Sequence, residues 1–247
     1  MNLLQALAVL AAGFTAGGIN AVVGSGSLVT FPMLLAVGYT PVTANVSNSI
    51  GLVFGNVSAV WGYRRELVGQ RERMTLGGTG TALGAIAGGV LLLTLPESVF
   101  EDVVPVLILI ACALMVMRPK PKLSYGSLSH HRKVALVATG FAVGIYGGYF
   151  GAAQGVILLA AMRFLIPDGL QRLNGLKNVM VGIANGVAAV LFVIFAHVAW
   201  DAAALVAVGS IGGAQLGARY GRRIPDQTLR WTVVTVGVAV AIVLFVK

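Results

Sequence analysis

Charged residues are scarce in this chain of 247 residues: they make up 10%, whereas hydrophobic residues make up 57%. A soluble domain of this size could not bury so many apolar side chains in one core. Acidic residues are scarcer still, with 8 Asp and Glu against 17 Lys and Arg. The composition therefore predicts an all-α polytopic membrane protein, because helices satisfy their own backbone hydrogen bonds in lipid.

Cysteine and histidine are almost absent. The single cysteine, Cys112, has no partner for a disulfide or a metal site, so we expect it to pack against other helices or face lipid. His130 and His131 are expected to be solvated in a basic loop, and His197 is the only histidine within a predicted span. No Ser/His/Asp set, phosphate-binding loop or Cys/His cluster is visible. The sequence therefore predicts no enzyme, no cofactor and no metal, and an intramembrane enzyme or a scaffold is the least favoured alternative.

Long apolar runs predict the membrane spans. They lie near residues 3–23, 43–62, 75–95, 99–117, 134–150, 178–196, 202–218 and 231–246. No positive charge precedes the first run, so we expect that helix to be retained and not cleaved as a signal peptide. Two shorter apolar runs, 27–37 and 155–166, each follow a break rich in small residues.

The two halves of the chain resemble each other. "AGFTAGGINAVVG" (12–24) aligns with "TGFAVGIYGGYFG" (139–151), and the alignment continues after an insertion of two residues and a further insertion of four. The matched pairs include Gly13 and Gly140, Gly24 and Gly151, Asn45 and Asn174, Asn56 and Asn185, and Gly84 and Gly217. Their order through both halves indicates a duplication.

Each half predicts a long helix, a break, a short helix and three more spans. If the first two helices form a hairpin, each half crosses the membrane an odd number of times, so the two repeats have inverted topology. The predicted units are a first repeat (1–117), a cytoplasmic linker (118–133) and a second repeat (134–247). With the N-terminus outside, every Lys and Arg except Lys247 falls in an inside loop. A parallel duplication would violate this positive-inside pattern.

The basic residues therefore follow membrane topology, and no nucleic-acid partner is expected. Aromatic residues agree with the predicted spans: Trp61, Tyr63, Trp200 and Trp231 fall at span ends, where their rings favour the headgroup layer.

The two breaks are the first candidate for a binding site. They consist of Gly24, Ser25, Gly26 and Ser27 in the first half, and of Gly151, Ala152, Ala153, Gln154 and Gly155 in the second. Irregular backbone at membrane depth survives only where protein or a water-filled cavity satisfies it. In many transporters, broken helices point their N-terminal N–H groups at an anion near the midplane. We favour such a site over a packing bend without a ligand.

Polar residues on one helix face in each half are the second candidate. They are Asn45, Asn48, Ser49 and Asn56 in the first half, and Asn174, Lys177, Asn178 and Asn185 in the second, with Asn20 and Gln215 as weaker candidates. We favour a role in lining the substrate path over interhelical hydrogen bonding, which remains the alternative. Lys177 is expected to snorkel to the interface, with attraction of an entering anion as the alternative. The spans are then free of deeply buried charge.

At these motifs the sequence resembles a known family. The segment "AGFTAGGINAVVGSGSLVTFPMLLAVGYTPVTANVSNSIGLVFGNVSAVWGYRREL" is similar to the N-terminal half of the sulfite exporter TauE/SafE family, and "GFAVGIYGGYFGAAQGVILLAAM" is similar to its second motif. The resemblance covers nearly the whole chain. It implies a bacterial cytoplasmic (inner) membrane protein that moves sulfite, sulfonates or related small organic anions, often outwards.

The leading hypothesis is therefore a secondary transporter that carries a small anion by alternating access, and the family resemblance implies export. A passive anion channel of the same architecture is the alternative. No Asp or Glu lies deep within the spans as a proton or sodium carrier, so the coupling ion stays open, as does the oligomeric state.

Overall fold

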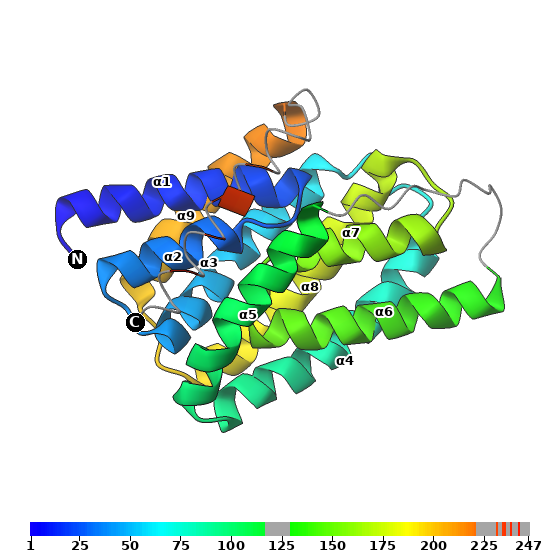
Figure 1. Ribbon diagram of the computed structural model, residues 1–247. Helices are drawn as coiled ribbons and strands as arrows, with labels where there is room; N and C mark the ends of the chain where they lie inside the picture. Colours follow the sequence, from blue (N-terminus) through cyan, green and yellow to red (C-terminus); the bar gives the residue numbers. More distant parts are fainter. Residues whose placement is uncertain (117–128, 221–230, 232–233, 236–237, 239–241, 243–247) are drawn as a thin grey trace.

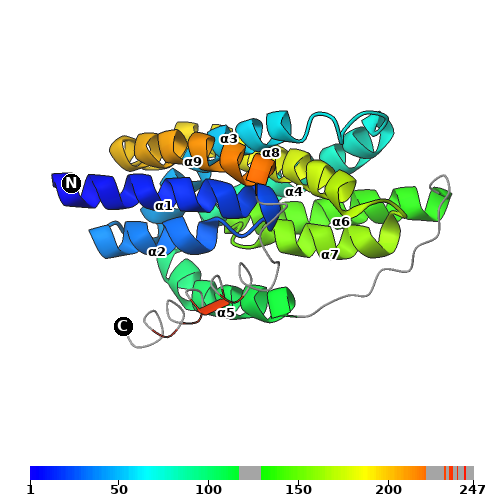
Figure 2. The same ribbon diagram turned by 90° about the horizontal axis from the view of Figure 1, so that it is seen from above.

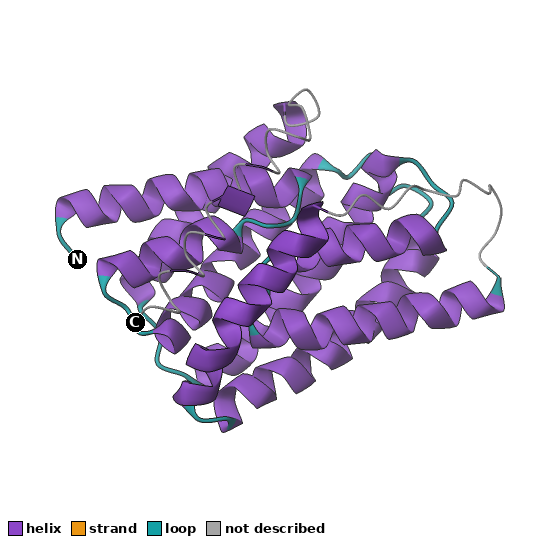
Figure 3. Cartoon of the chain, in the orientation of Figure 1, coloured by secondary structure: helices purple, strands orange, loops and turns teal. Residues whose placement is uncertain are grey.

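The computed structural model describes residues 1–116 and 129–220, together with residues 231, 234, 235, 238 and 242. Within these residues every regular element is an α-helix and no strand occurs (Figure 3). This confirms the all-α fold. Most of the predicted linker 118–133 and most of the predicted span 231–246 lie outside the described residues.

The described residues form nine helices. They are α1 (Leu3–Val22), α2 (Ser27–Val37), α3 (Pro41–Gly62), α4 (Arg71–Thr94), α5 (Glu97–Val116), α6 (His130–Tyr149), α7 (Gln154–Leu165), α8 (Leu170–Phe195) and α9 (Trp200–Tyr220). The short helices α2 and α7 follow the two breaks, as the sequence predicts.

Local sequence accounts for several helix ends. Asn2 begins α1 with a capping box, in which its side chain accepts from the Gln5 N–H at 2.8 Å and its own N–H donates to the Gln5 side chain at 2.9 Å. Thr40 caps α3, and Pro41 follows at the first helical position, where the missing N–H costs nothing. Gly38, with a φ of +108°, ends α2 in the left-handed conformation.

The two breaks create two helical hairpins. α1 packs on α2 and α6 packs on α7, and within each pair the chain reverses direction (Figures 1 and 2). The α1–α2 hairpin opens toward the end of the bundle where the chain begins, and the α6–α7 hairpin opens toward the other end. Their turns point at each other, so the folding of the hairpins brings both breaks to the middle of the bundle.

Glycine seams join the two halves. α4 packs on α6, and α1 packs on α9. A Cβ atom added to Gly84 would overlap the Phe141 carbonyl oxygen, and one added to Gly213 would overlap the Phe14 carbonyl oxygen. Small residues allow membrane helices to approach this closely, and the packing gained substitutes for the hydrophobic drive that lipid does not supply.

These seams correct the predicted alignment of the halves. Phe14 and Phe141 are predicted equivalents, and they contact Gly213 and Gly84 respectively. Under the predicted repeat, Gly84 therefore corresponds to Gly213 and not to Gly217. The second insertion, of four residues, is wrong by about one helical turn because glycines recur every turn along these helices.

Four of the described helices, α1, α4, α8 and α9, are long and apolar enough to cross a bilayer by length and composition alone. The predicted spans 43–62, 99–117 and 134–150 correspond to α3, α5 and α6, which fall outside this group. α3 carries several buried amides, and α5 and α6 begin with charged or histidine residues. α3 is shielded by its neighbours, since it packs on α8 and α9.

Three expectations about single residues are now decided. Cys112 is buried, so it packs against other helices and does not face lipid. Trp61 and Trp200 are exposed near helix ends, as predicted. The expected headgroup position of Tyr63 is wrong: its side chain is fully buried, and its hydroxyl accepts a hydrogen bond from the Asn174 amide at 3.2 Å.

Candidate functional site at the two helix breaks

The two breaks lie directly against each other. The Gly155 N–H, at the start of α7, donates to the Gly24 carbonyl oxygen at 3.1 Å. A Cβ on Gly24 would lie 2.5 Å from the Gly155 Cα, and one on Gly155 would lie 2.6 Å from the Gly24 Cα. A side chain at either position would push the backbones apart, so glycine is required at both.

The first break leaves several hydrogen-bond donors without a partner. Gly24 has a φ of +88°, which turns the chain out of α1. Within the described residues, the backbone N–H groups of Ser25, Gly26 and Ser27 make no hydrogen bond. The Ser25 hydroxyl, only 1% exposed, makes none either. Unpaired donors at the positive end of a helix dipole create an environment that favours an anion.

The second break has a similar turn with fewer free donors. Gly151 has a φ of +75°, and Ala153 follows with a φ of +56°, a strained conformation for a residue with a Cβ. The N–H groups of Ala152 and Ala153 make no hydrogen bond within the described residues. The Tyr146 hydroxyl donates to the Ala152 carbonyl oxygen at 2.5 Å. This break offers no hydroxyl like that of Ser25.

Two asparagines hold the carbonyl groups that the breaks leave free. The Asn174 amide of α8 donates to the Val22 carbonyl oxygen at 3.0 Å, and the Asn45 amide of α3 donates to the Tyr149 carbonyl oxygen at 3.0 Å. Val22 and Tyr149 are the last residues of α1 and α6. Because the last carbonyls of a helix lack an intrahelical partner, each amide caps a broken helix from a neighbouring one. This geometry supports the interhelical alternative for these two residues.

A second pair of amide contacts involves Asn56 of α3 and Asn185 of α8, further along the helices that carry Asn45 and Asn174. Asn20 donates to the Asn56 side chain at 2.7 Å, and Gln154 donates to the Asn185 side chain at 2.9 Å. Asn20 belongs to α1, whereas Gln154 begins α7. Gly147, the predicted equivalent of Asn20, leaves space there, since a Cβ on it would overlap the Gln154 amide oxygen. The two halves thus supply the same contact from different helices.

These amides keep further unused polar atoms. Within the described residues, four of these amide side chains each keep one buried atom without a hydrogen-bond partner: Asn45 Oδ1, Asn56 Nδ2, Gln154 Oε1 and Asn174 Oδ1. Buried polar atoms are almost always satisfied by protein, water or a ligand. Their grouping around the breaks therefore marks this region as one that binds water or a ligand.

The expected snorkelling of Lys177 is wrong. Its side chain is fully buried, and its Nζ donates to the carbonyl oxygens of Asn20 at 2.9 Å and Ala21 at 3.3 Å. The Asn178 amide also donates to Ala21, at 3.1 Å. The end of α1 attracts the amine because its carbonyls are free and lie at the negative end of the helix dipole. The burial of Lys177 also overturns the expectation that no Lys, Arg, Asp or Glu lies deep within the spans.

Of the remaining candidates, Asn48 and Ser49 lie in the interior, whereas Gln215 is exposed. Asn48 accepts a hydrogen bond from the Thr30 hydroxyl of α2, and Ser49 is buried on α3. The Gln215 amide donates to the Ser58 carbonyl oxygen at 3.0 Å and so ties α9 to α3. None of these contacts involves either break directly.

The histidines do not gather at the site. His130 and His131 are exposed at the start of α6, and His197 lies in the loop after α8, not within a span as expected. Among the described residues, no group of three or more His, Cys, Asp or Glu could hold a metal ion.

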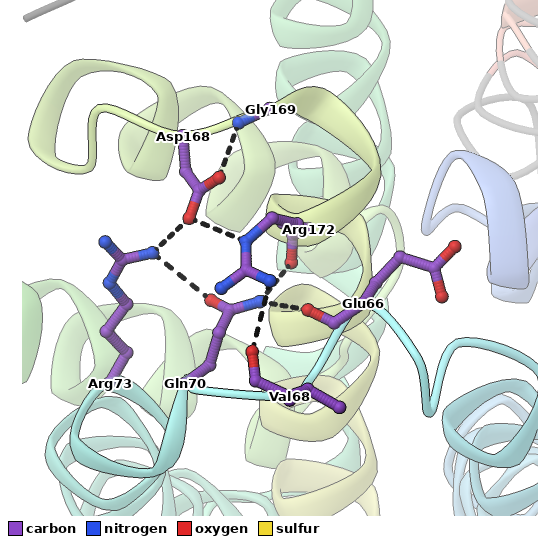
Figure 4. Close-up of polar contacts among 7 residues, drawn as sticks. All are labelled: Glu66, Val68, Gln70, Arg73, Asp168, Gly169 and Arg172. Carbon is purple, nitrogen blue, oxygen red and sulfur yellow. Dashed lines mark hydrogen bonds and ion pairs between the residues drawn. The ribbon is translucent and has the colours of Figure 1, made fainter. Parts of the chain in front are cut away.

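An ion-pair cluster that the sequence did not predict joins two loops at one end of the bundle (Figure 4). Asp168, in the loop before α8, accepts from Arg73 at 2.5 Å and from Arg172 at 3.0 Å. The fully buried Gln70 donates to the Glu66 and Arg172 carbonyl oxygens at 2.9 and 3.0 Å. Burial raises the pKa of Asp168, but hydrogen bonds from both arginines outweigh this and lower the pKa below its usual range.

A smaller polar contact lies at the opposite end of the bundle. The Tyr39 hydroxyl, in the loop after α2, donates to both carboxylate oxygens of Asp201 at 2.9 and 3.0 Å. Burial and the facing Asp201 carboxylate raise the pKa of Tyr39. Tyr39 and Asp168 both lie in the loop that follows a short helix, so matching loops of the two halves carry the contacts at the two ends. Tyr39 and Asp168 are different residue types, so the sequence did not reveal that these two loops correspond.

Together, the long apolar helices and the two opposed helix hairpins indicate a multi-pass membrane protein. The family model "Sulfite exporter TauE/SafE" matches residues 9–244, so the chain belongs to that family. No solved structure matched the chain significantly.

Curated relatives carry transporter names. A "Probable membrane transporter protein ORF9" of Sinorhizobium sp is 26% identical over 236 residues, which cover 94% of this chain and 88% of that protein. The "Probable membrane transporter protein YfcA" of Escherichia coli K12 is 27% identical over 209 residues, covering 83% and 76%. A "Probable membrane transporter protein" of Haemophilus influenzae is 28% identical over 212 residues, covering 84% and 81%. The chain is accordingly a membrane transporter of the bacterial inner membrane.

Proposed function

We propose that this protein is a secondary transporter that exports a small anion, such as sulfite or an organosulfonate, by alternating access. The observation that carries the proposal is the group of unpaired hydrogen-bond donors at the start of α2. These are the N–H groups of Ser25, Gly26 and Ser27 and the hydroxyl of Ser25. Together they suit the oxygens of a sulfite or sulfonate group, and family membership favours the same substrate class.

The proposed substrate site lies where the two halves meet. Ser25 follows Gly24, which contacts Gly155 of the second break, and the Lys177 side chain passes within 3.2 Å of the Cβ position of Gly24. An anion bound by Ser25 would therefore lie close to an amine and to the contact between the hairpins. Relative movement of the hairpins would change the site on both sides.

We further propose that residues 1–117 and 134–247 are inverted repeats. The opposite directions of the two hairpins in Figures 1 and 2 support this, as does the exchange of partners in the seams, where α1 packs on α9 and α6 packs on α4. Inverted repeats have two related arrangements, which gives a physical basis for alternating access.

The polar contacts at the two ends are the proposed gates. Asp168 with Arg73 closes one end, and Tyr39 with Asp201 closes the other. Both contacts are formed together, which corresponds to an occluded state. Opening one gate while the other stays closed would expose the breaks to one side of the membrane at a time.

Flux of radiolabelled sulfite from proteoliposomes, with a panel of competing sulfonates, tests the proposal. We expect saturable flux in the wild type and a KM raised about tenfold in Ser25→Ala, because one hydrogen bond to a charged group contributes about 1.5 kcal/mol. The matched control is Ser58→Ala, whose hydroxyl donates to the Ile211 carbonyl oxygen at 2.9 Å, away from the breaks. This control should keep the wild-type KM.

Three outcomes would contradict the proposal or the site it names. If no anion of the panel moved or bound, the substrate class would be wrong. If the protein conducted in planar bilayers far faster than a carrier can turn over, it would be the passive channel. An unchanged KM in Ser25→Ala, with the protein folded, would remove the first break from the site.

A further inference from the structure

Lys177 is a buried cationic residue type without a counter-ion. Its Nζ contacts two backbone carbonyl oxygens, and none of the ion pairs among the described residues includes it. The helices α1, α2, α3, α7 and α8 offer it no carboxylate, and Glu72 of α4, which also packs on α8, is exposed and paired with Lys133 of α6. α1, α2 and α3 contain no Asp, Glu, Lys, Arg or His, and α7 contains only Arg163, in its last turn. α8 adds Arg172, which is paired with Asp168. The neighbouring Tyr63 hydroxyl accepts a hydrogen bond from the Asn174 amide.

The hydrogen bonds at Nζ match a neutral amine. A neutral amine has two N–H groups, and the carbonyl oxygens of Asn20 and Ala21 accept two hydrogen bonds. An ammonium group has a third N–H and a positive charge, and among the described residues Nζ makes no third hydrogen bond and no ion pair. An unpaired charge in the membrane interior is costly, whereas a charge that is paired with an anion is far less so.

The position of Lys177 connects this charge to the proposed site. Its Cδ lies 3.2 Å from the Cβ position of Gly24 and 3.1 Å from that of Gly155. The side chain therefore runs along the contact between the two breaks. Gly24 immediately precedes the unpaired donors of Ser25, so an anion at those donors would lie beside the chain segment that the amine contacts.

Resting on the proposed function, we infer that Lys177 carries a proton that crosses the membrane together with the anion. The amine takes up one proton from the side to which the site is open, and the resulting ammonium group pairs with one monovalent anion. On the other side the anion leaves and the ammonium group releases its proton. No other bond forms or breaks, and one proton moves with each anion.

The coupling follows from the net charge of the site. The empty site with a neutral amine and the loaded site with an ammonium–anion pair are both neutral, so both can be occluded. A site with only the proton, or with only the anion, carries a net charge and is held back from occlusion by the cost of burying it. Transport is therefore electroneutral symport, and the combined anion and proton gradients set its direction. An anion that accumulates inside the cell is exported with its proton.

Methanesulfonate is the probe that tests this inference, because it stays a monovalent anion and carries no titratable proton of its own. In wild-type proteoliposomes we expect one proton, reported by an internal pH dye, to move with each radiolabelled methanesulfonate. An imposed membrane potential should leave the initial rate unchanged. Movement that follows the potential, or that leaves the internal pH unaltered, would overturn the inference.

A variant with a fixed charge gives a second test. Arg stays protonated, so in Lys177→Arg the empty site remains charged. We expect net methanesulfonate flux to fall at least tenfold, while exchange of internal for external methanesulfonate continues. The control Lys133→Arg alters an exposed lysine that pairs with Glu72, and it should leave both activities unchanged. Net proton-coupled flux at the wild-type rate in Lys177→Arg would overturn the inference.

The experiments distinguish a failure of the proposed function from a failure of the proton-coupling inference. If neither sulfite nor methanesulfonate moves, the proposed function fails, and the inference fails with it. If methanesulfonate moves saturably without protons, the proposed function stands and Lys177 is not the proton carrier. If only sulfite moves, the same potential and pH measurements at acidic pH, where the monoanion dominates, decide the matter. If Lys177→Arg does not fold, the wild-type measurement decides it without a variant.

Discussion

The packing of α4 on α6 predicts opposite effects for the same substitution at two glycines. In Gly84→Ala the new Cβ would overlap the Phe141 carbonyl oxygen and lie 2.8 Å from the Ile145 nitrogen. In Gly186→Ala, on α8, no atom of the described residues lies within 4 Å of the new Cβ. The first methyl group therefore meets backbone, which cannot rotate away, whereas the second meets open space.

The magnitudes follow from two competing terms. Replacing Gly by Ala within a helix stabilises it by about 1 kcal/mol at either position. At Gly84, α4 and α6 must also separate by roughly 1 Å, and overpacking of this kind costs about 1–3 kcal/mol. We therefore expect Gly84→Ala to destabilise the protein by up to about 2 kcal/mol, and Gly186→Ala to stabilise it by up to about 1 kcal/mol.

Thermal unfolding of the purified protein in detergent measures both effects. At about 2–4 °C per kcal/mol for a chain of this size, the melting temperature should fall by several degrees in Gly84→Ala and rise slightly in Gly186→Ala. The wild type and Gly186→Ala define the propensity effect, so the difference between the variants isolates the seam. An equal or higher melting temperature in Gly84→Ala would refute the backbone contact between α4 and α6.

Three further predictions concern the polar contacts. Asp168→Asn should lower the melting temperature at neutral pH. The pKa of Asp168 is lowered in the folded protein, so its ion pairs stabilise the fold above about pH 4, and this stabilisation is lost as the pH falls through the folded pKa. In Asp168→Asn that loss of stability at acidic pH should be absent. Asn45→Ala should cost about 1–3 kcal/mol, measured by the same melting assay, because it leaves the Tyr149 carbonyl oxygen unpaired in the interior. Tyr39→Phe removes both hydrogen bonds to Asp201 and should speed labelling of a cysteine placed at Ser25 by a reagent added on the Tyr39 side; unchanged labelling would rule out a gate there.

Much of the fold was predictable from the sequence. Apolar runs of sufficient length predicted the helices, since backbone groups in lipid must bond within their own segment. "GSGS" and "GAAQG" located both breaks, because small residues interrupt apolar runs that would otherwise continue as helix. The paired asparagines, such as Asn45 and Asn174, were found by their spacing on one helix face.

The tertiary structure decided what those residues touch. Lys177 looked like an interfacial residue because a sequence gives position along a helix but not the neighbours around it; the free carbonyls of α1 draw it inward. Gln154 contacts Asn185 only because the second break folds its side chain into space that Gly147 leaves open. The register of the seams likewise required the backbone contacts, since glycines one turn apart are indistinguishable in the sequence. Composition and periodicity thus determined the membrane class, the helices and the breaks, which depend on local chemistry, while long-range packing determined the partners of each polar group.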